Sequence, residues 1–172
     1  SVREESGVYL CQKYLNVDAQ WVVDPTMLLQ KEDYEKLIDN YKTPSCKGNL
    51  FCYILDSTPD KENLIKRIAD EKKLTPFAMT ESNGDVKNNI NGLIKRPIEC
   101  WLKSFKDAEF IITDSFHACV FSIIFNKPFV VIGNKDRGMA RFDSLFKIFK
   151  IKDNLLFSCT DYVPGKDYSL PT

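Results

Sequence analysis

Phe110-Ile-Ile-Thr-Asp-Ser-Phe-His117 is followed by Ala118-Cys-Val-Phe-Ser-Ile-Ile-Phe125 and then by Lys127-Pro-Phe-Val-Val-Ile-Gly133, and these segments decide the fold. Phe110–Ile112 and Phe129–Ile132 are short apolar runs rich in β-branched residues. Such runs are typical of strands that are covered on both faces in a parallel sheet. Roughly a dozen residues separate them, which is enough for one crossover helix. The stretch therefore predicts a βαβ unit with a right-handed connection.

The turn between the first of these strands and the helix is polar. Asp114 and Ser115 are good N-cap residues, so we expect the helix to begin there. Its free N–H groups and positive dipole end would then point at the carboxyl edge of the sheet, where an anionic ligand is favoured. His117, the only histidine of the chain, lies at this turn. The sequence thus puts one titratable group where α/β proteins usually hold their ligands.

The remaining sequence alternates between strand-like and helix-like segments. The expected strands are Trp21–Val23, Leu50–Leu55, Pro76–Met79 and Leu155–Phe157. The expected helices are Glu4–Leu15, Lys31–Tyr41, Asp60–Lys73, Pro97–Lys106 and Met139–Phe149. We interpret residues 81–95 as a polar surface loop over the ligand edge and residues 161–172 as an irregular tail. The alternation predicts an α/β fold in one domain spanning residues 1–172, with a Rossmann-like, doubly wound parallel sheet.

The first expected helix has an apolar stripe formed by Val8, Leu10, Cys11 and Leu15. A stripe of this kind normally faces a core. The chain opens with Ser1-Val2-Arg3 and has no initial methionine. We expect it to be the C-terminal domain of a longer protein, with a missing N-terminal domain.

Composition and charge exclude several classes of protein. Of the 172 residues, 44% are hydrophobic, and 24 Lys and Arg balance 24 Asp and Glu. No basic run interleaved with aromatic residues suggests nucleic-acid binding, and no stretch is apolar enough to span a bilayer. The six cysteines are scattered, without a CxxC pair or a second histidine, so we expect reduced thiols and no metal site.

Several side chains at the predicted carboxyl edge are candidates for chemistry. His117 could exchange a proton near neutrality, although a lone histidine beside a helix start is more often a structural hydrogen-bonding group. Arg137 and Arg141 follow the next strand, and Arg3 follows the first, so each could offer its guanidinium to a carboxylate or phosphate there. Ordinary surface arginines are the alternative. Asp24-Pro25-Thr26 is interpreted as a simple strand-to-helix turn.

A resemblance to a known family rests on several motifs taken in order. They are Ser1-Val-Arg-Glu-Glu-Ser-Gly7, Val23-Asp-Pro-Thr26, Ile112-Thr-Asp-Ser-Phe-His117, Val120-Phe-Ser-Ile-Ile-Phe125, Lys127-Pro-Phe129, Gly133-Asn134, Arg137-Gly138 and Arg141-Phe142. Together they resemble the C-terminal half of the polysaccharide pyruvyl transferase family. The likeness covers nearly the whole chain, and no single motif carries it.

The resemblance implies one half of a GT-B-type transferase, in which two Rossmann-like domains face each other. It implies phosphoenolpyruvate as the donor, no cofactor, and a glycan or lipid-linked sugar as the acceptor of a pyruvate ketal. Arg3 and His117 match positions that engage phosphoenolpyruvate, with Arg137 and Arg141 as weaker matches. Ser115 and Phe116 would seat the phosphate, and His117 would be the catalytic acid or base.

The same resemblance suggests a bacterial, cytoplasmic enzyme at the inner face of the membrane, and a fragment that is inactive alone. Two other interpretations remain open at this stage. One is half of a sugar-nucleotide-dependent glycosyltransferase with the same fold. The other is a non-catalytic binding module of that fold.

Overall fold

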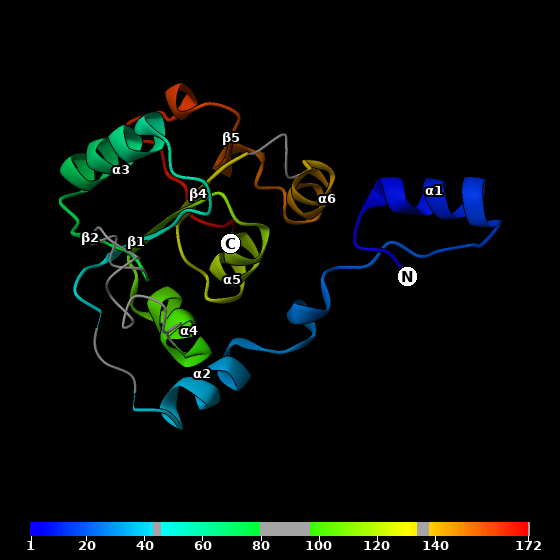
Figure 1. Ribbon diagram of the computed structural model, residues 1–172, viewed down its shortest axis with the longest axis horizontal. Coiled ribbons are helices and arrows are strands. Elements are labelled where there is room, and N and C mark those ends of the chain that lie inside the picture. The colour runs from blue at the N-terminus through cyan, green and yellow to red at the C-terminus, as the bar shows by residue number, and fades with distance from the viewer. Residues whose placement is uncertain (43–45, 80–96, 134–137, 172) are drawn as a thin grey trace, which may run out of the picture.

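The computed structural model describes residues 1–42, 46–79, 97–133 and 138–171. Its centre is a five-stranded, all-parallel sheet (Figure 1). The strands are β1 (Leu50–Tyr53), β2 (Pro76–Phe77), β3 (Phe110–Thr113), β4 (Phe129–Ile132) and β5 (Leu155–Leu156). Their order in the sheet is β2-β1-β3-β4-β5. The predicted βαβ unit is confirmed, with β3 at the middle of the sheet.

The strand order reverses direction between β1 and β3. From β1 the chain moves outward to β2, then returns past β1 to β3 and continues to β5. In open α/β sheets, ligands bind outside the carboxyl ends of the strands at such a switch point. The fold is therefore an α/β sheet compatible with the Rossmann-like class, as predicted, and it directs attention to the residues that follow β1 and β3.

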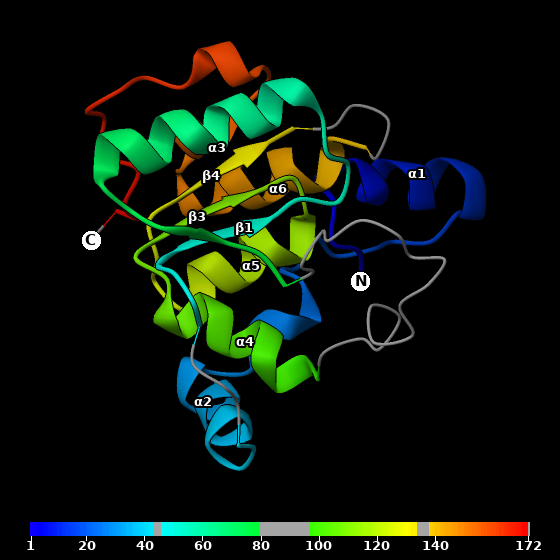
Figure 2. The same ribbon diagram turned by 60° about the vertical axis from the view of Figure 1, so that its left-hand side comes forward.

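Helices cover both faces of the sheet (Figures 1 and 2). Alternate strand residues point to opposite faces, so that Phe51, Ile111 and Val131 join one buried cluster and Leu50 and Ile112 the other. The first face is covered by α4 (Ile98–Asp107), α5 (Phe116–Ile124) and α6 (Ala140–Phe149), with α2 (Lys31–Asp39) packed outside α4. The second face is covered by α3 (Pro59–Lys72) and the C-terminal segment.

Aromatic side chains dominate the first face. Phe105 lies edge-on to Phe51 at a centroid distance of 5.0 Å, and Trp101 lies edge-on to Phe105 at 4.7 Å and to Phe121 at 4.9 Å. Edge-to-face pairs add to the stability that burial of the rings supplies. This cluster fixes α4 and α5 against the sheet, and with them the turn that begins α5.

The N-terminal segment differs from the prediction. Trp21–Val23 forms no strand of the sheet; Trp21 makes an isolated parallel bridge to Val2, with hydrogen bonds from Val2 N to Gln20 O (2.8 Å) and from Val22 N to Val2 O (2.9 Å). The helix that follows Val2, α1 (Glu5–Leu15), contacts α6 and has no buried residue. Its expected apolar stripe does not face a core, and Leu15 is 68% exposed. This short apolar run lacks a neighbouring strand along its length, so it forms a bridge and not a strand of the sheet.

The C-terminal segment lacks long regular elements but is packed. It contains the short helices η4 (Lys152–Asn154) and η5 (Cys159–Asp161), and beyond them Tyr162 and Tyr168 are buried and stacked at 5.4 Å. The Asn154 amide donates to Phe129 O and Tyr168 O, which ties the segment to β4. The loop predicted at residues 81–95 lies outside the described residues. None of the helices described is both long and apolar enough to cross a membrane.

Candidate functional site

The turn from β3 to α5 is held by side-chain hydrogen bonds. Ser115 is the N-cap of α5, and its hydroxyl accepts from Ala118 N at 3.5 Å. Ser115 N in turn donates to Thr113 Oγ1, whose hydroxyl donates to Tyr53 O on β1. The predicted cap is thus confirmed for Ser115. It places His117 in the first turn of α5, with half of its side chain exposed.

Asp114 does not cap the helix, contrary to the prediction. Its buried carboxylate accepts from Leu55 N (2.7 Å), Asp56 N (3.1 Å) and Lys61 Nζ (2.7 Å). Leu55 and Asp56 follow β1, and Lys61 belongs to the first turn of α3. A carboxylate taken out of water needs such partners, and the turn after β1 offers them. Asp114 therefore joins the ends of β1 and β3 at the switch point.

A second buried carboxylate, Asp24, brings together the two residues singled out in the sequence. Oδ2 of Asp24 accepts a hydrogen bond from Arg3 Nη1 and lies 3.8 Å from His117 Nε2. Oδ1 accepts from Thr26 N (3.0 Å) and Thr26 Oγ1 (2.6 Å). We call Arg3, Asp24 and His117 the Asp24 cluster. It joins the N-terminal segment to the first turn of α5.

The surroundings of Asp24 keep it ionised. Burial by itself raises the pKa of the Asp24 carboxyl, but hydrogen bonds from the side chain and backbone of Thr26, and from Arg3, outweigh it and lower the pKa. Thr26 is itself fixed, because Tyr34 on α2 donates to its carbonyl oxygen at 2.7 Å. Asp24 is therefore a negative charge in a defined position between Arg3 and His117.

Arg141 approaches the same region from α6. Its guanidinium carbon lies 5.0 Å from the centroid of the Phe116 ring, and Phe116 and His117 are edge-on at 5.5 Å. Arg141 Nε is also 3.9 Å from a carboxylate oxygen of Glu4, which is a weak and partly exposed contact. Stacking on Phe116 keeps the planar guanidinium near the start of α5.

The structure thus groups most of the predicted site residues and adds one. Arg3 and His117 meet at Asp24, while Arg141 and Phe116 form a neighbouring pair. Arg137 lies outside the described residues. Asp24 was interpreted as an ordinary turn residue, although the Val23-Asp-Pro-Thr26 motif that contains it was one of those carrying the family resemblance. The presence of Asp24 in a motif shared with the family was the feature of the sequence that could have indicated its role.

No group of three or more His, Cys, Asp or Glu side chains suited to a metal ion occurs within the described segments. The six cysteines, all of them described, are free thiols. The described residues at the carboxyl edge include two guanidinium groups, the Asp24 carboxylate and one imidazole beside a helix N-terminus. Such a set is suited to holding an anion and moving a proton.

The fold and the grouped residues define an α/β protein in which two arginines, a buried carboxylate and a histidine lie at the carboxyl edge of the sheet. The polysaccharide pyruvyl transferase family model matches residues 1–136, and the chain belongs to this family. No curated protein and no solved structure matches the chain. Family membership implies a transferase that acts on a polysaccharide.

Proposed function

We propose that this protein transfers the pyruvyl group of phosphoenolpyruvate to a sugar of a bacterial polysaccharide or its precursor, as a ketal. The observation that carries the proposal is the convergence of Arg3 and His117, distant in sequence, on the same buried carboxylate, that of Asp24. Family membership supplies the class of reaction. The proposal adds the donor, the product and the roles of the residues.

The reaction makes defined demands on a site. A sugar hydroxyl adds to C2 of phosphoenolpyruvate and loses its proton, while C3 gains a proton and becomes a methyl group. A second hydroxyl then attacks C2, loses its proton and displaces phosphate, which closes the ketal. The site must therefore transfer protons and hold a small, highly charged anion.

His117 is the proposed proton-transfer group. Its half-exposed imidazole can reach a substrate, and Nε2 lies within ion-pair distance of Asp24. Asp24 cannot easily serve as the acid itself, because its pKa is lowered and it stays ionised near neutrality. In this proposal Asp24 orients the imidazole and His117 exchanges protons with the donor carbon and the acceptor hydroxyl.

Arg3 and Arg141 are the proposed anion contacts. Arg3 donates a hydrogen bond from Nη1 to Asp24. Among the described residues, no protein group is bonded to Nε or Nη2 of Arg3. Those N–H groups remain for a carboxylate or a phosphate. Arg141 presents its guanidinium beside Phe116, and the backbone N–H groups of Phe116 and His117 in the first turn of α5 add a phosphate seat next to Ser115. Arg137 is a further candidate on the grounds of sequence.

The proposal is tested with the purified full-length protein, phosphoenolpyruvate and the polysaccharide of the source organism. Ketal formation is followed by the pyruvate methyl signal in proton NMR and by release of phosphate. We expect His117→Ala to abolish both, and Arg3→Gln to reduce them, while Arg67→Gln on α3 has no effect. Phosphoenolpyruvate should raise the melting temperature of the wild type and a nucleotide sugar should not. Full activity of His117→Ala, or stabilisation by the nucleotide sugar alone, contradicts the proposal.

A further inference from the structure

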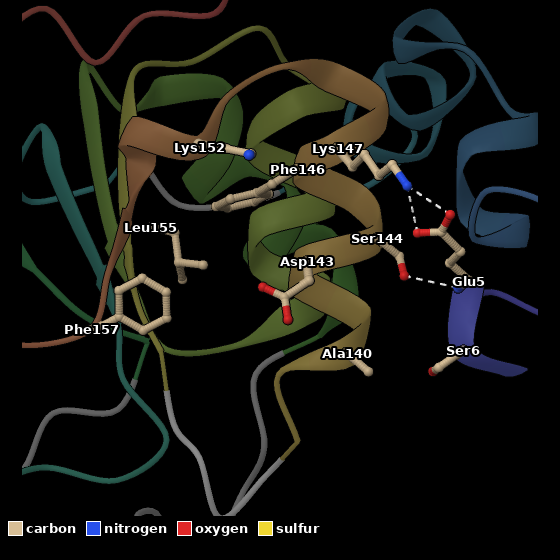
Figure 3. A pocket seen from close by; sticks show the side chains of 10 residues that line it. All are labelled: Glu5, Ser6, Ala140, Asp143, Ser144, Phe146, Lys147, Lys152, Leu155 and Phe157. Atoms are coloured by element: carbon tan, nitrogen blue, oxygen red, sulfur yellow. Dashed lines mark hydrogen bonds and ion pairs between the residues drawn. The ribbon is translucent and has the colours of Figure 1, made fainter.

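A pocket of about 580 Å³ lies between α1, α6 and the end of β5 (Figure 3). We call it the α6 pocket. Its volume is within the range of about 300–1,000 Å³ that is common for small-molecule sites. None of Arg3, Asp24 and His117 lines it. The α6 pocket is therefore separate from the Asp24 cluster.

One wall of the α6 pocket is apolar. It consists of Phe146, Leu155 and Phe157, which stand on the side of the pocket that is opposite Glu5 and Ser6 (Figure 3). Phe157 follows β5 directly and is 64% exposed, although it is one of the largest apolar side chains. An exposed aromatic ring at the mouth of a pocket offers a flat surface to the C–H face of a ligand. A pyranose ring has such a face.

The charged groups of the pocket balance each other. Lys147 Nζ is bonded to both carboxylate oxygens of Glu5, at 2.6 and 2.7 Å, and Glu5 N donates to Ser144 Oγ at 3.0 Å. Asp143 and Lys152 make no side-chain hydrogen bond or ion pair with any described residue. The lining contains two acids, two bases and no arginine. Such a site favours a neutral ligand with hydroxyl groups over an anion, since hydroxyls bond to both carboxylate and ammonium groups.

The α6 pocket and the proposed donor site share one turn of helix. Ala140 and Asp143 line the pocket, whereas Arg141, between them, stacks on Phe116. Likewise, Glu5 lines the pocket while the preceding Glu4 approaches Arg141. The α6 pocket and Arg141, which is proposed to hold the donor, are therefore adjacent along α6.

We propose that the α6 pocket binds a neutral sugar ring of the acceptor glycan. Phe157 stacks against the ring, and Asp143 and Lys152 bond to its hydroxyl groups. The place of this ring in the reaction rests on the proposed function, but its binding does not. This assigns part of acceptor recognition to the present chain.

Saturation-transfer NMR tests the proposal with three neutral probes: methyl β-D-glucopyranoside, methyl β-D-galactopyranoside and methyl N-acetyl-β-D-glucosaminide. We expect at least one probe to bind the wild type. Phe157→Ala and Asp143→Asn should weaken its binding about tenfold or more. Tyr41→Ala is the matched control, because Tyr41 is an exposed aromatic residue outside the pocket. It should bind the probe as the wild type does.

Two results overturn the proposal. One is the absence of saturation transfer to all three probes, and the other is equal binding by the wild type, Phe157→Ala and Asp143→Asn. Phosphoenolpyruvate is titrated in parallel to separate this proposal from the previous one. Arg3→Gln should weaken binding of phosphoenolpyruvate and leave binding of the sugar probe unchanged. Phe157→Ala should weaken binding of the sugar probe and leave binding of phosphoenolpyruvate unchanged. Sugar binding without any donor binding would refute the proposed function while supporting the sugar site.

Discussion

Nε2 of His117 lies 3.8 Å from Oδ2 of Asp24, the same oxygen that accepts the hydrogen bond from Arg3. One carboxylate oxygen therefore lies beside both an arginine and the histidine that we propose to transfer protons. Thr26 donates two hydrogen bonds to the other oxygen of that carboxylate, and Tyr34 donates to the carbonyl oxygen of Thr26. Changing Asp24 should affect stability and the proposed chemistry together, whereas changing His117 should affect the chemistry alone.

Asp24→Asn should destabilise the fold at neutral pH by about 1–2 kcal/mol, because the bond to Arg3 loses its ionic character and Arg3 is partly exposed. The pKa of Asp24 is lowered from 3.8 in the folded state, so its charge stabilises the fold above that value. The contribution disappears as the pH falls through the lowered pKa. Urea unfolding should show the same difference from wild type at pH 7 and pH 5 and a smaller difference at pH 3. An equal difference at pH 3 and pH 7 would contradict this account.

Ser115→Ala should lower the free energy of unfolding by about 1 kcal/mol, the usual loss when an N-cap residue is replaced by alanine. It should also weaken binding of phosphoenolpyruvate. Thr58→Ala is the matched control, since Thr58 caps α3 through its hydroxyl in the same way but does not belong to the proposed donor site. Chemical denaturation should give similar losses of stability for the two variants. Only Ser115→Ala should reduce the thermal shift produced by the donor. If Ser115→Ala binds phosphoenolpyruvate as the wild type does, Ser115 is not part of the donor site.

Lys61→Met should destabilise the protein by about 3–5 kcal/mol, because it leaves the buried Asp114 carboxylate without its cation. Two backbone N–H groups remain as its partners, and they do not neutralise the charge. Lys66→Met, at an exposed position of the same helix, should change stability by less than about 0.5 kcal/mol. Guanidinium unfolding curves compare the two. Similar midpoints for both variants would mean that the Lys61–Asp114 pair does not stabilise the switch point.

Arg141→Lys should raise the KM for phosphoenolpyruvate about tenfold with little change in kcat, because an ammonium group neither stacks on Phe116 nor offers two parallel N–H donors. Arg67→Lys provides the comparison, since Arg67 lies over the Tyr162 ring on the other face of the sheet. Its kinetics should match those of the wild type. If Arg141→Lys also matches, Arg141 is not an anion contact.

Cys52 and Cys119 should resist alkylation in the folded protein. Burial raises the pKa of the Cys52 thiol to about 12 and that of Cys119 well above its ordinary value, so little thiolate forms at pH 8. Mass spectrometry after brief treatment with iodoacetamide should find both unmodified, while the partly exposed Cys11 is labelled. Both should react once guanidinium unfolds the chain. Rapid labelling of Cys52 without denaturant would show that β1 opens readily.

Much of the sheet was predictable because its strands are buried on both faces. β3 and β4 are short, largely apolar runs rich in β-branched residues, which is typical of strands covered on both faces. The same argument failed for Trp21–Val23. Its residues have the strand pattern, but a strand also needs a neighbour along its length, and only Val2 bridges to Trp21. Local sequence does not contain that information.

The sequence by itself determined the βαβ unit, the cap at Ser115 and the position of His117 in the first turn of α5, because each depends on residues close together in the chain. Only the tertiary structure decided that Asp114 turns inward to Lys61 and that Asp24 lies between Arg3 and His117. A buried carboxylate is stabilised by whichever donors the fold brings to it, and those donors come from distant segments. The partners of a buried carboxylate therefore depend on how the whole chain packs, and local sequence does not specify them.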